Sequence, residues 1–178
     1  MHIRPADLAD IDAILALDHA YETDHVWQMS GNAGLREFHT DFALVKLPRM
    51  IQVNYPHEAP ALRRVLHRCD YLWVMQSAAP RDLLGYIGMS IVPWQNTGWI
   101  PAFAVLAGER RKGIGTQLLR AAIAQAKTAG LHSVTLDVQT KNYPATKLLQ
   151  ARGFRYGGYA DNYYNSHDIA LFFAYRIR

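Results

Sequence analysis

The strongest indication of chemistry is a short basic turn that contains two closely spaced glycines. Residues 108–116 read Gly-Glu-Arg-Arg-Lys-Gly-Ile-Gly-Thr, with an apolar run before them and a helical pattern after them. The first turn of a helix has unpaired N–H groups at the positive end of the helix dipole, and glycine lets a phosphate approach the backbone closely. The turn therefore predicts an anion site at a helix start, although a basic loop that only closes a strand–helix connection has the same composition. The residues assigned to this site are Arg110, Arg111, Lys112, Gly113, Ile114, Gly115 and Thr116.

Two common phosphate-binding motifs are excluded by the residues that follow the glycines. A Walker A loop needs Lys followed by Ser or Thr directly after its second glycine. Gly108 and Gly113 have the required spacing, but Ile114 follows them. A dinucleotide fingerprint needs a third glycine three residues after Gly115, and Leu118 occupies that place. The turn therefore belongs to neither class.

Regular elements on both sides would hold this turn in place. We expect a strand over residues 99–105 and a long amphipathic helix over 112–129, followed by a buried strand over 133–138. Asn142 is the predicted N-cap of a short helix that ends near Ala151. The turn thus lies inside a strand–helix–strand unit, with a further capped helix directly after it.

The rest of the chain completes an α/β pattern with several antiparallel connections. Residues 21–32 have poor periodicity, Pro48 is expected to end a strand, and Pro80 marks a turn between two strands. Because a helix connects residues 103–105 to 134–138, these two strands are expected to be parallel neighbours in a mixed, mostly antiparallel, strongly twisted sheet flanked by helices. The further elements expected are helices over 7–17, with Asp7 as N-cap, and 60–69, and strands over 38–45, 71–76, 83–92, 154–164 and 168–178.

Composition restricts the class of protein. The chain has 178 residues, of which 50% are hydrophobic and 19% charged, as suits one soluble domain. The N-terminus lacks the apolar run of a signal peptide, and no window approaches the length of a membrane helix. The single cysteine, Cys69, fits a reducing cytoplasm. The net charge is +4, but the basic residues are scattered apart from the cluster 110–112, which favours a local anion site over a nucleic-acid surface.

Two motifs in the correct order resemble those of the GNAT acetyltransferases. Arg110-x-x-Gly113-x-Gly115 matches the pyrophosphate motif of that family, Arg/Gln-x-x-Gly-x-Gly/Ala. Downstream, Asn142-x-x-Ala145 and the later Ala-Arg-Gly-Phe segment resemble the family's Asn-x-x-Ala and Gly-Phe pattern. The strand before the turn and the helix after it also have the family's lengths.

Within that family, the second half of the chain is most similar to the streptothricin acetyltransferases. The similar stretches are 94–100, 136–142, 154–159 and 168–173. The resemblance implies one acetyltransferase domain over residues 1–178 with the GNAT fold, in which two central parallel strands splay apart. It also implies acetyl-CoA as the acyl donor, bound by a core at about 84–178, and no metal. A homodimer is a further expectation, because many family members dimerise.

The same resemblance assigns residues to the acyl donor. Backbone groups of the strand before the turn would pair with the pantetheine arm, the turn would hold the pyrophosphate, and the capped helix would contact the donor where the strands splay. The residues so assigned are Phe103, Ala104 and Val105 for pantetheine, 110–116 for pyrophosphate, and Asn142 and Ala145 at the splay.

The family's usual general base is missing from its place. Many members carry a glutamate on the strand before the phosphate turn, and the streptothricin enzymes carry a Glu-Asp pair where this chain has Pro101-Ala102. Asp137 is the candidate replacement, because it lies five residues before Asn142, where the ribosomal-protein alanine acetyltransferases carry a glutamate. A carboxylate there could take the amine proton directly or through water. The alternative for Asp137 is a salt bridge or a backbone hydrogen bond.

The family's usual general acid is missing as well. A tyrosine normally lies four residues after the alanine of the second motif, and Leu149 occupies that position. A thiolate also leaves without an acid, because thiols have modest pKa values. The candidate replacements are Tyr143 in the first turn of the same helix and Tyr159 on the last hairpin, with Tyr163 and Tyr164 as further choices.

The acceptor and any metal are the least defined by the sequence. Asp24, Asp161 and Asp168 could attract a cationic amine, or they could cap turns. The histidines show no metal-binding spacing with the cysteine, so no metal site is expected. Three functions remain open: an N-acetyltransferase for small-molecule amines, a protein or peptide N-acetyltransferase, and a non-catalytic acyl-CoA-binding module. The first is favoured, with an aminoglycoside- or streptothricin-like acceptor.

Overall fold

The computed structural model describes residues 1–34, 36–78 and 82–178. Its body is a seven-stranded sheet in the order β1-β4-β5-β6-β7-β9-β8, in which only β6 and β7 pair in parallel. The predicted α/β class and mixed, mostly antiparallel sheet are therefore confirmed. The strands of this sheet are β1 (His2–Pro5), β4 (Tyr71–Gln76), β5 (Leu83–Val92), β6 (Thr97–Val105), β7 (Ser133–Gln139), β8 (Arg155–Ala160) and β9 (Ala170–Arg176).

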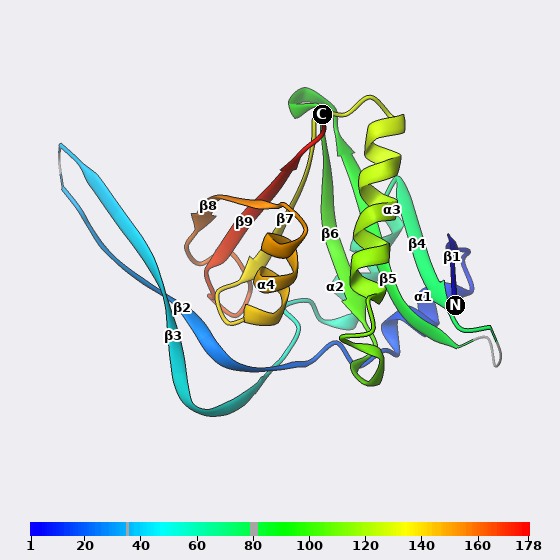
Figure 1. Cartoon of the computed structure of the whole chain (residues 1–178), viewed down its shortest axis with the longest axis horizontal. Coiled ribbons are helices and arrows are strands. Elements are labelled where there is room, and N and C mark those ends of the chain that lie inside the picture. Colours follow the sequence, from blue (N-terminus) through cyan, green and yellow to red (C-terminus); the bar gives the residue numbers. More distant parts are fainter. Residues whose placement is uncertain (35, 79–81) are drawn as a thin grey trace.

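Helices cover both faces of the sheet (Figure 1). Helix α3 (Ile114–Thr128) packs on β5 and β6, and α4 (Tyr143–Ala151) follows β7. Helices α1 (Asp10–Leu15) and α2 (Ala59–His67) pack with each other on the other face. Helix α1 is shorter than predicted, because Asp7 accepts hydrogen bonds from the N–H groups of the turn that precedes the helix.

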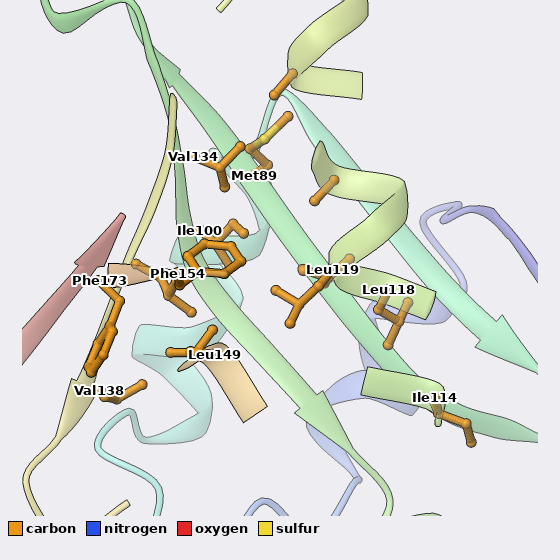
Figure 2. Close-up of a cluster of buried hydrophobic side chains, with 14 of the residues drawn as sticks. Met89, Ile100, Ile114, Leu118, Leu119, Val134, Val138, Leu149, Phe154 and Phe173 are labelled. Atoms are coloured by element: carbon orange, nitrogen blue, oxygen red, sulfur yellow. The ribbon is translucent and has the colours of Figure 1, made fainter. Parts of the chain in front are cut away.

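The core lies between α3 and the sheet. Ile114, Leu118 and Leu119 of α3 are at most 1% exposed and meet Met89 and Ile100 of the central strands. Figure 2 shows Leu118 and Leu119 on the helix side of this cluster, Phe154 beside Ile100, and Phe173 on the side toward β9. This packing fixes the start of α3, and with it the phosphate turn, against β6.

A long β-hairpin projects from this body (Figure 1). It consists of β2 (Tyr21–Ala33), where the sequence indicated no clear element, and β3 (Phe38–Val53). The prediction that Pro48 ends β3 is wrong. Thr23 pairs with Ile51 and the next paired residue, His25, pairs with Lys46, so Pro48 lies in a bulge where it need not donate to the ladder. The predicted turn at Pro80 lies outside the described residues.

Strands β6 and β7 are parallel neighbours only along part of their length. Residues 97–100 pair with residues 133–136, and the pairing stops there. The parallel pair is confirmed, but residues 103–105 are not in its paired part: they lie in the splayed part (Figure 1). At the same point β6 has a bulge, since Gly88 pairs with Ala102 while Ser90 pairs with Trp99.

Candidate active site

A cleft of about 600 Å³ opens beside the splayed end of β6. Its walls are the end of β6, the turn before α3, the start of α4 and the segment that leads into β2. The sequence assigned most of its lining to the acyl donor. The assigned residues that line it are Phe103, Ala104, Val105, Arg110, Arg111, Gly113, Gly115, Thr116, Asn142 and Ala145.

The turn before α3 has the backbone shape of an anion site. Gly113 is the N-cap of α3 and has φ 85°, a conformation that glycine adopts without strain. A Cβ on Gly113 would meet no atom within 4 Å, so the space beside it is open. Arg111 also has a positive φ, of 66°. The unpaired N–H groups of the first turn of α3 therefore lie next to open space at the cleft.

Gly115 has a different role from Gly113. A Cβ on Gly115 would lie 3.1 Å from a Leu148 methyl and 3.3 Å from the Phe103 ring. Gly115 thus lets α3 approach both β6 and α4 closely. Ile114, the buried residue between the two glycines, anchors the same turn in the core.

The charged side chains of the turn are partly engaged within the protein. Arg110 donates from Nε to the Val105 carbonyl at 3.0 Å and from a terminal nitrogen to the Ala20 carbonyl at 2.7 Å. Arg110 therefore ties the turn to the end of β6 and to the segment before β2. Lys112 pairs with Glu109 at 2.8 Å on the surface, whereas Arg111 is exposed.

The predicted cap of α4 is confirmed. The Asn142 side-chain oxygen accepts a hydrogen bond from the Ala145 N–H at 3.1 Å. Both residues line the cleft and also a smaller pocket of about 60 Å³ that continues between β6 and β7. This inner pocket lies where the two strands cease to pair, and residues of both strands form its walls.

Asp137 lies in the inner pocket. Its Oδ2 accepts a hydrogen bond from the Tyr164 hydroxyl at 2.5 Å, and it has no described salt bridge. Burial raises the pKa of Asp137, and the Tyr164 hydrogen bond offsets part of that rise. Burial and the adjacent carboxylate raise the pKa of Tyr164, so its phenol stays protonated. A carboxylate with a raised pKa and a fixed orientation is suited to accept a proton.

The structure does not bring Tyr143 or Tyr159 to either cavity. The Tyr143 ring packs on His25, with centroids 4.8 Å apart. The Tyr159 hydroxyl lies 2.9 Å from Thr40 Oγ1, because β8 meets the hairpin there. Leu149, at the family's usual tyrosine position, is a buried wall of the inner pocket.

Two other tyrosines do reach the inner pocket, Tyr55 and Tyr164. Tyr164 is one of the tyrosines in the last hairpin that the sequence offers as a general acid without a preference among them. Tyr55 follows β3, and no sequence pattern indicates it as a site residue, because a lone tyrosine in a connecting segment has no characteristic spacing. Only the path of the chain from β3 to α2 brings Tyr55 next to β6.

Two kinds of feature are not found among the described residues. No group of three or more His, Cys, Asp or Glu side chains in residues 1–34, 36–78 and 82–178 could hold a metal ion. No helix in that same part of the chain is long and apolar enough to cross a membrane.

The parallel strand pair splays beside a glycine turn at a helix start, with a cleft next to both, as the resemblance to the GNAT acetyltransferases predicts. The chain belongs to the acetyltransferase (GNAT) family, whose model matches residues 35–154. It is therefore an acetyl-CoA-dependent acetyltransferase, which sets aside the non-catalytic module.

Similar proteins agree with this membership. The streptothricin acetyltransferase of Streptomyces lavendulae is 29% identical over 161 residues, which cover 87% of this chain and 82% of that protein. A protein of Bacillus subtilis (strain 168), provisionally assigned as a ribosomal protein bS18-alanine N-acetyltransferase, is 31% identical over 91 residues, 50% of this chain and 59% of that protein.

Solved structures show the same fold over almost the whole chain. A nourseothricin acetyltransferase has a TM-score of 0.85 at 20% identity and covers 99% of this chain and 98% of its own. A protein of Bacillus anthracis strain Ames, provisionally assigned as a streptothricin acetyltransferase and solved with acetyl coenzyme A, has a TM-score of 0.78 at 20% identity with the same coverage.

Proposed function

We propose that this enzyme transfers the acetyl group of acetyl-CoA to a primary amine of a small, streptothricin-like molecule. The observation that carries the proposal is the position of Asp137, which lines a pocket that shares Phe103, Asn142 and Ala145 with the cleft beside the glycine turn. The streptothricin acetyltransferase of Streptomyces lavendulae supports this acceptor class, since the similarity covers most of both chains.

The cleft offers suitable groups for each part of the acyl donor. The first N–H groups of α3 would hold the pyrophosphate, with the exposed Arg111 adding charge. Residues 103–105 lie beyond the last parallel pair, so their backbone groups facing β7 would pair with the pantetheine arm. Arg110 would position the turn rather than contact the acyl donor, because its guanidinium donates hydrogen bonds to two backbone carbonyls.

Asp137 would act as the general base. An amine is a nucleophile only when it is neutral, and a carboxylate within reach can take its proton as the new C–N bond forms. The raised pKa of Asp137 makes it a stronger base than an exposed aspartate. Tyr164 would keep the carboxylate aimed at the pocket, because its hydroxyl holds one oxygen and leaves the other available.

An acceptor screen tests the proposal. The purified chain would be given acetyl-CoA with streptothricin, and the release of free thiol would be followed together with the mass of the product. We expect saturable thiol release and a product heavier by one acetyl group. Thiol release that does not depend on streptothricin would contradict the proposed acceptor class.

A peptide acceptor is the second candidate. It is favoured by the similarity of half of this chain to the Bacillus subtilis protein assigned to ribosomal protein bS18-alanine acetylation, and by the position of Asp137. A peptide that begins with alanine is therefore the second arm of the screen. Faster turnover of that peptide than of streptothricin would favour this candidate.

A further inference from the structure

The inner pocket and the cleft share one tyrosine, Tyr55. The other tyrosines that line these cavities already donate their hydroxyl protons: Tyr164 donates to Asp137 and Tyr21 donates to the Gln139 side chain. Tyr55 is half-buried and packs against the face of the sheet that carries Tyr86 and Ala102. Tyr55 therefore lies between the place expected for the thioester and the place expected for the pantetheine arm.

The surroundings of Tyr55 form a path for protons. Its hydroxyl interacts with the backbone N–H of Phe103, on the splayed part of β6, and with the Tyr86 hydroxyl. Tyr86 is fully buried, and its hydroxyl lies 3.0 Å from His19 Nε2. His19 lines the cleft, and its ring centroid is 5.0 Å from that of Tyr55. Hydroxyl and imidazole groups thus connect the inner pocket to the open cleft.

We propose that Tyr55 is the general acid of this enzyme and takes the place of the family tyrosine that Leu149 replaces. The proposal rests on the proposed function, because it assigns a residue to the same acetyl transfer. The amine lone pair attacks the thioester carbon, and Asp137 takes the amine proton. The C–S bond then breaks, its electrons stay on sulfur, and sulfur takes the Tyr55 proton. Tyr55 regains a proton from Tyr86, Tyr86 from His19, and His19 from water in the cleft. Asp137 releases the amine proton to water, which neutralises the hydroxide left by His19, so the cycle closes with one amide and one thiol formed.

The charge state of these groups fits that direction of transfer. Burial raises the pKa of Tyr55 to about 12, so the hydroxyl carries its proton at neutral pH. The Tyr55 and Tyr86 hydroxyls interact, and because each can donate or accept, a proton can pass between them. Burial lowers the pKa of His19, which keeps the imidazole neutral and able to relay a proton.

The test compares leaving groups rather than acceptors. Wild type, Tyr55→Phe and Asp137→Asn would be assayed with hydroxylamine as a small nucleophile, using acetyl-CoA and its selenoester analogue. A selenol is a stronger acid than a thiol and needs no proton to leave. We expect Tyr55→Phe to lower kcat with acetyl-CoA about tenfold or more at unchanged KM, and to lose no more than about twofold with the selenoester. Tyr86→Phe should show the same pattern more weakly, and Tyr71→Phe, stacked on Trp73 outside both cavities, should match wild type.

Two results would overturn the role of Tyr55. One is an unchanged kcat of Tyr55→Phe with acetyl-CoA. The other is an equal loss with both donors, which would mean that Tyr55 only shapes the pocket or polarises the carbonyl. A wild-type enzyme that releases no thiol with hydroxylamine, streptothricin or the alanine peptide would instead overturn the proposed function.

Discussion

Strands β6 and β7 differ sharply between their two ends. At the paired end, residues 97–100 and 133–136 form a parallel ladder whose apolar side chains are buried in the core. At the splayed end, the same strands form the walls of the inner pocket and carry Asp137. Two neighbouring strands thus contribute packing at one end and the walls of a pocket at the other.

The difference shows how a sheet makes room for a substrate. Pro101 is the first β6 residue beyond the last parallel pair, and it has no N–H to give to a neighbouring strand. Residues 100 and 101 of β6 both lie opposite Met89 of β5, and this two-to-one pairing is the bulge. A bulge redirects the strand and ends regular pairing. Pro101 therefore favours the splay of β6 away from β7.

The largest expected effect comes from the splayed end. Asp137→Asn should lower turnover by about a hundredfold or more, the usual scale of general base catalysis, while CoA affinity is retained. The loss should shrink at high pH, because a free amine then needs no base. Turnover and calorimetric CoA binding would be measured, with the exposed Asp41→Asn as control. Full activity of Asp137→Asn near pH 7 would remove Asp137 from the mechanism.

Asp137→Asn should also change the free energy of unfolding in a predictable direction. The pKa of Asp137 is higher in the folded protein than in the unfolded chain. Its contribution to the stability of the fold is therefore present at pH values below its pKa in the unfolded chain. That contribution is lost as the pH rises through its pKa in the folded protein. At pH 7 Asp137→Asn should therefore unfold at the same or a higher denaturant concentration than wild type. A less stable variant at pH 7 would mean that the Tyr164 hydrogen bond outweighs the cost of burial.

A substitution at the paired end of β6 and β7 should lower the stability of the protein rather than its turnover. Val134→Ala removes two buried methyl groups from a fully buried position and should cost about 2 kcal/mol of unfolding free energy. CoA affinity should not change. Urea denaturation would measure the loss, and Val45→Ala on the exposed hairpin is the matched control. Comparable losses in the two variants would contradict the assignment of the core to this end.

The turn before α3 should respond in CoA affinity. Gly115→Glu adds a side chain against Phe103 and Leu148 and a negative charge at the expected anion site, so CoA should bind about tenfold more weakly. Gly157→Glu makes the same charge change on the exposed strand β8, where a Cβ would meet only the Phe172 carbonyl at 3.8 Å, and it should bind CoA normally. Calorimetry that finds equal affinity for Gly115→Glu and wild type would refute the pyrophosphate site.

The smallest effect is expected from Tyr164. Tyr164→Phe removes the hydrogen bond that lowers the pKa of Asp137, so that pKa should rise further. The acidic limb of the kcat/KM profile should then move to higher pH, with only a few-fold loss at its plateau. Tyr163→Phe changes the neighbouring exposed ring and should leave the profile in place. An acidic limb that does not move would show that another group sets it.

Local signals in the sequence predicted much of the donor side. The Asn142 cap, the start of α3 at the glycine turn and the strands around it follow from short-range rules of capping, periodicity and backbone conformation. The hairpin was harder to predict, because a bulge rather than a strand end accommodates Pro48. The two tyrosines chosen as acids, Tyr143 and Tyr159, do not line either cavity, since sequence position says little about where a tyrosine points.

The sequence by itself determined most elements of the second half of the chain, the glycine turn before α3 and the presence of a carboxylate at Asp137, because each depends on residues close together in the chain. The tertiary structure alone decided what surrounds that carboxylate. Tyr164 reaches Asp137 only because β9 pairs with β7, and Tyr55 reaches the splay only because the chain passes from the hairpin to α2 beside β6. Contacts between residues distant in the chain depend on register and on loop paths, and short sequence patterns record neither.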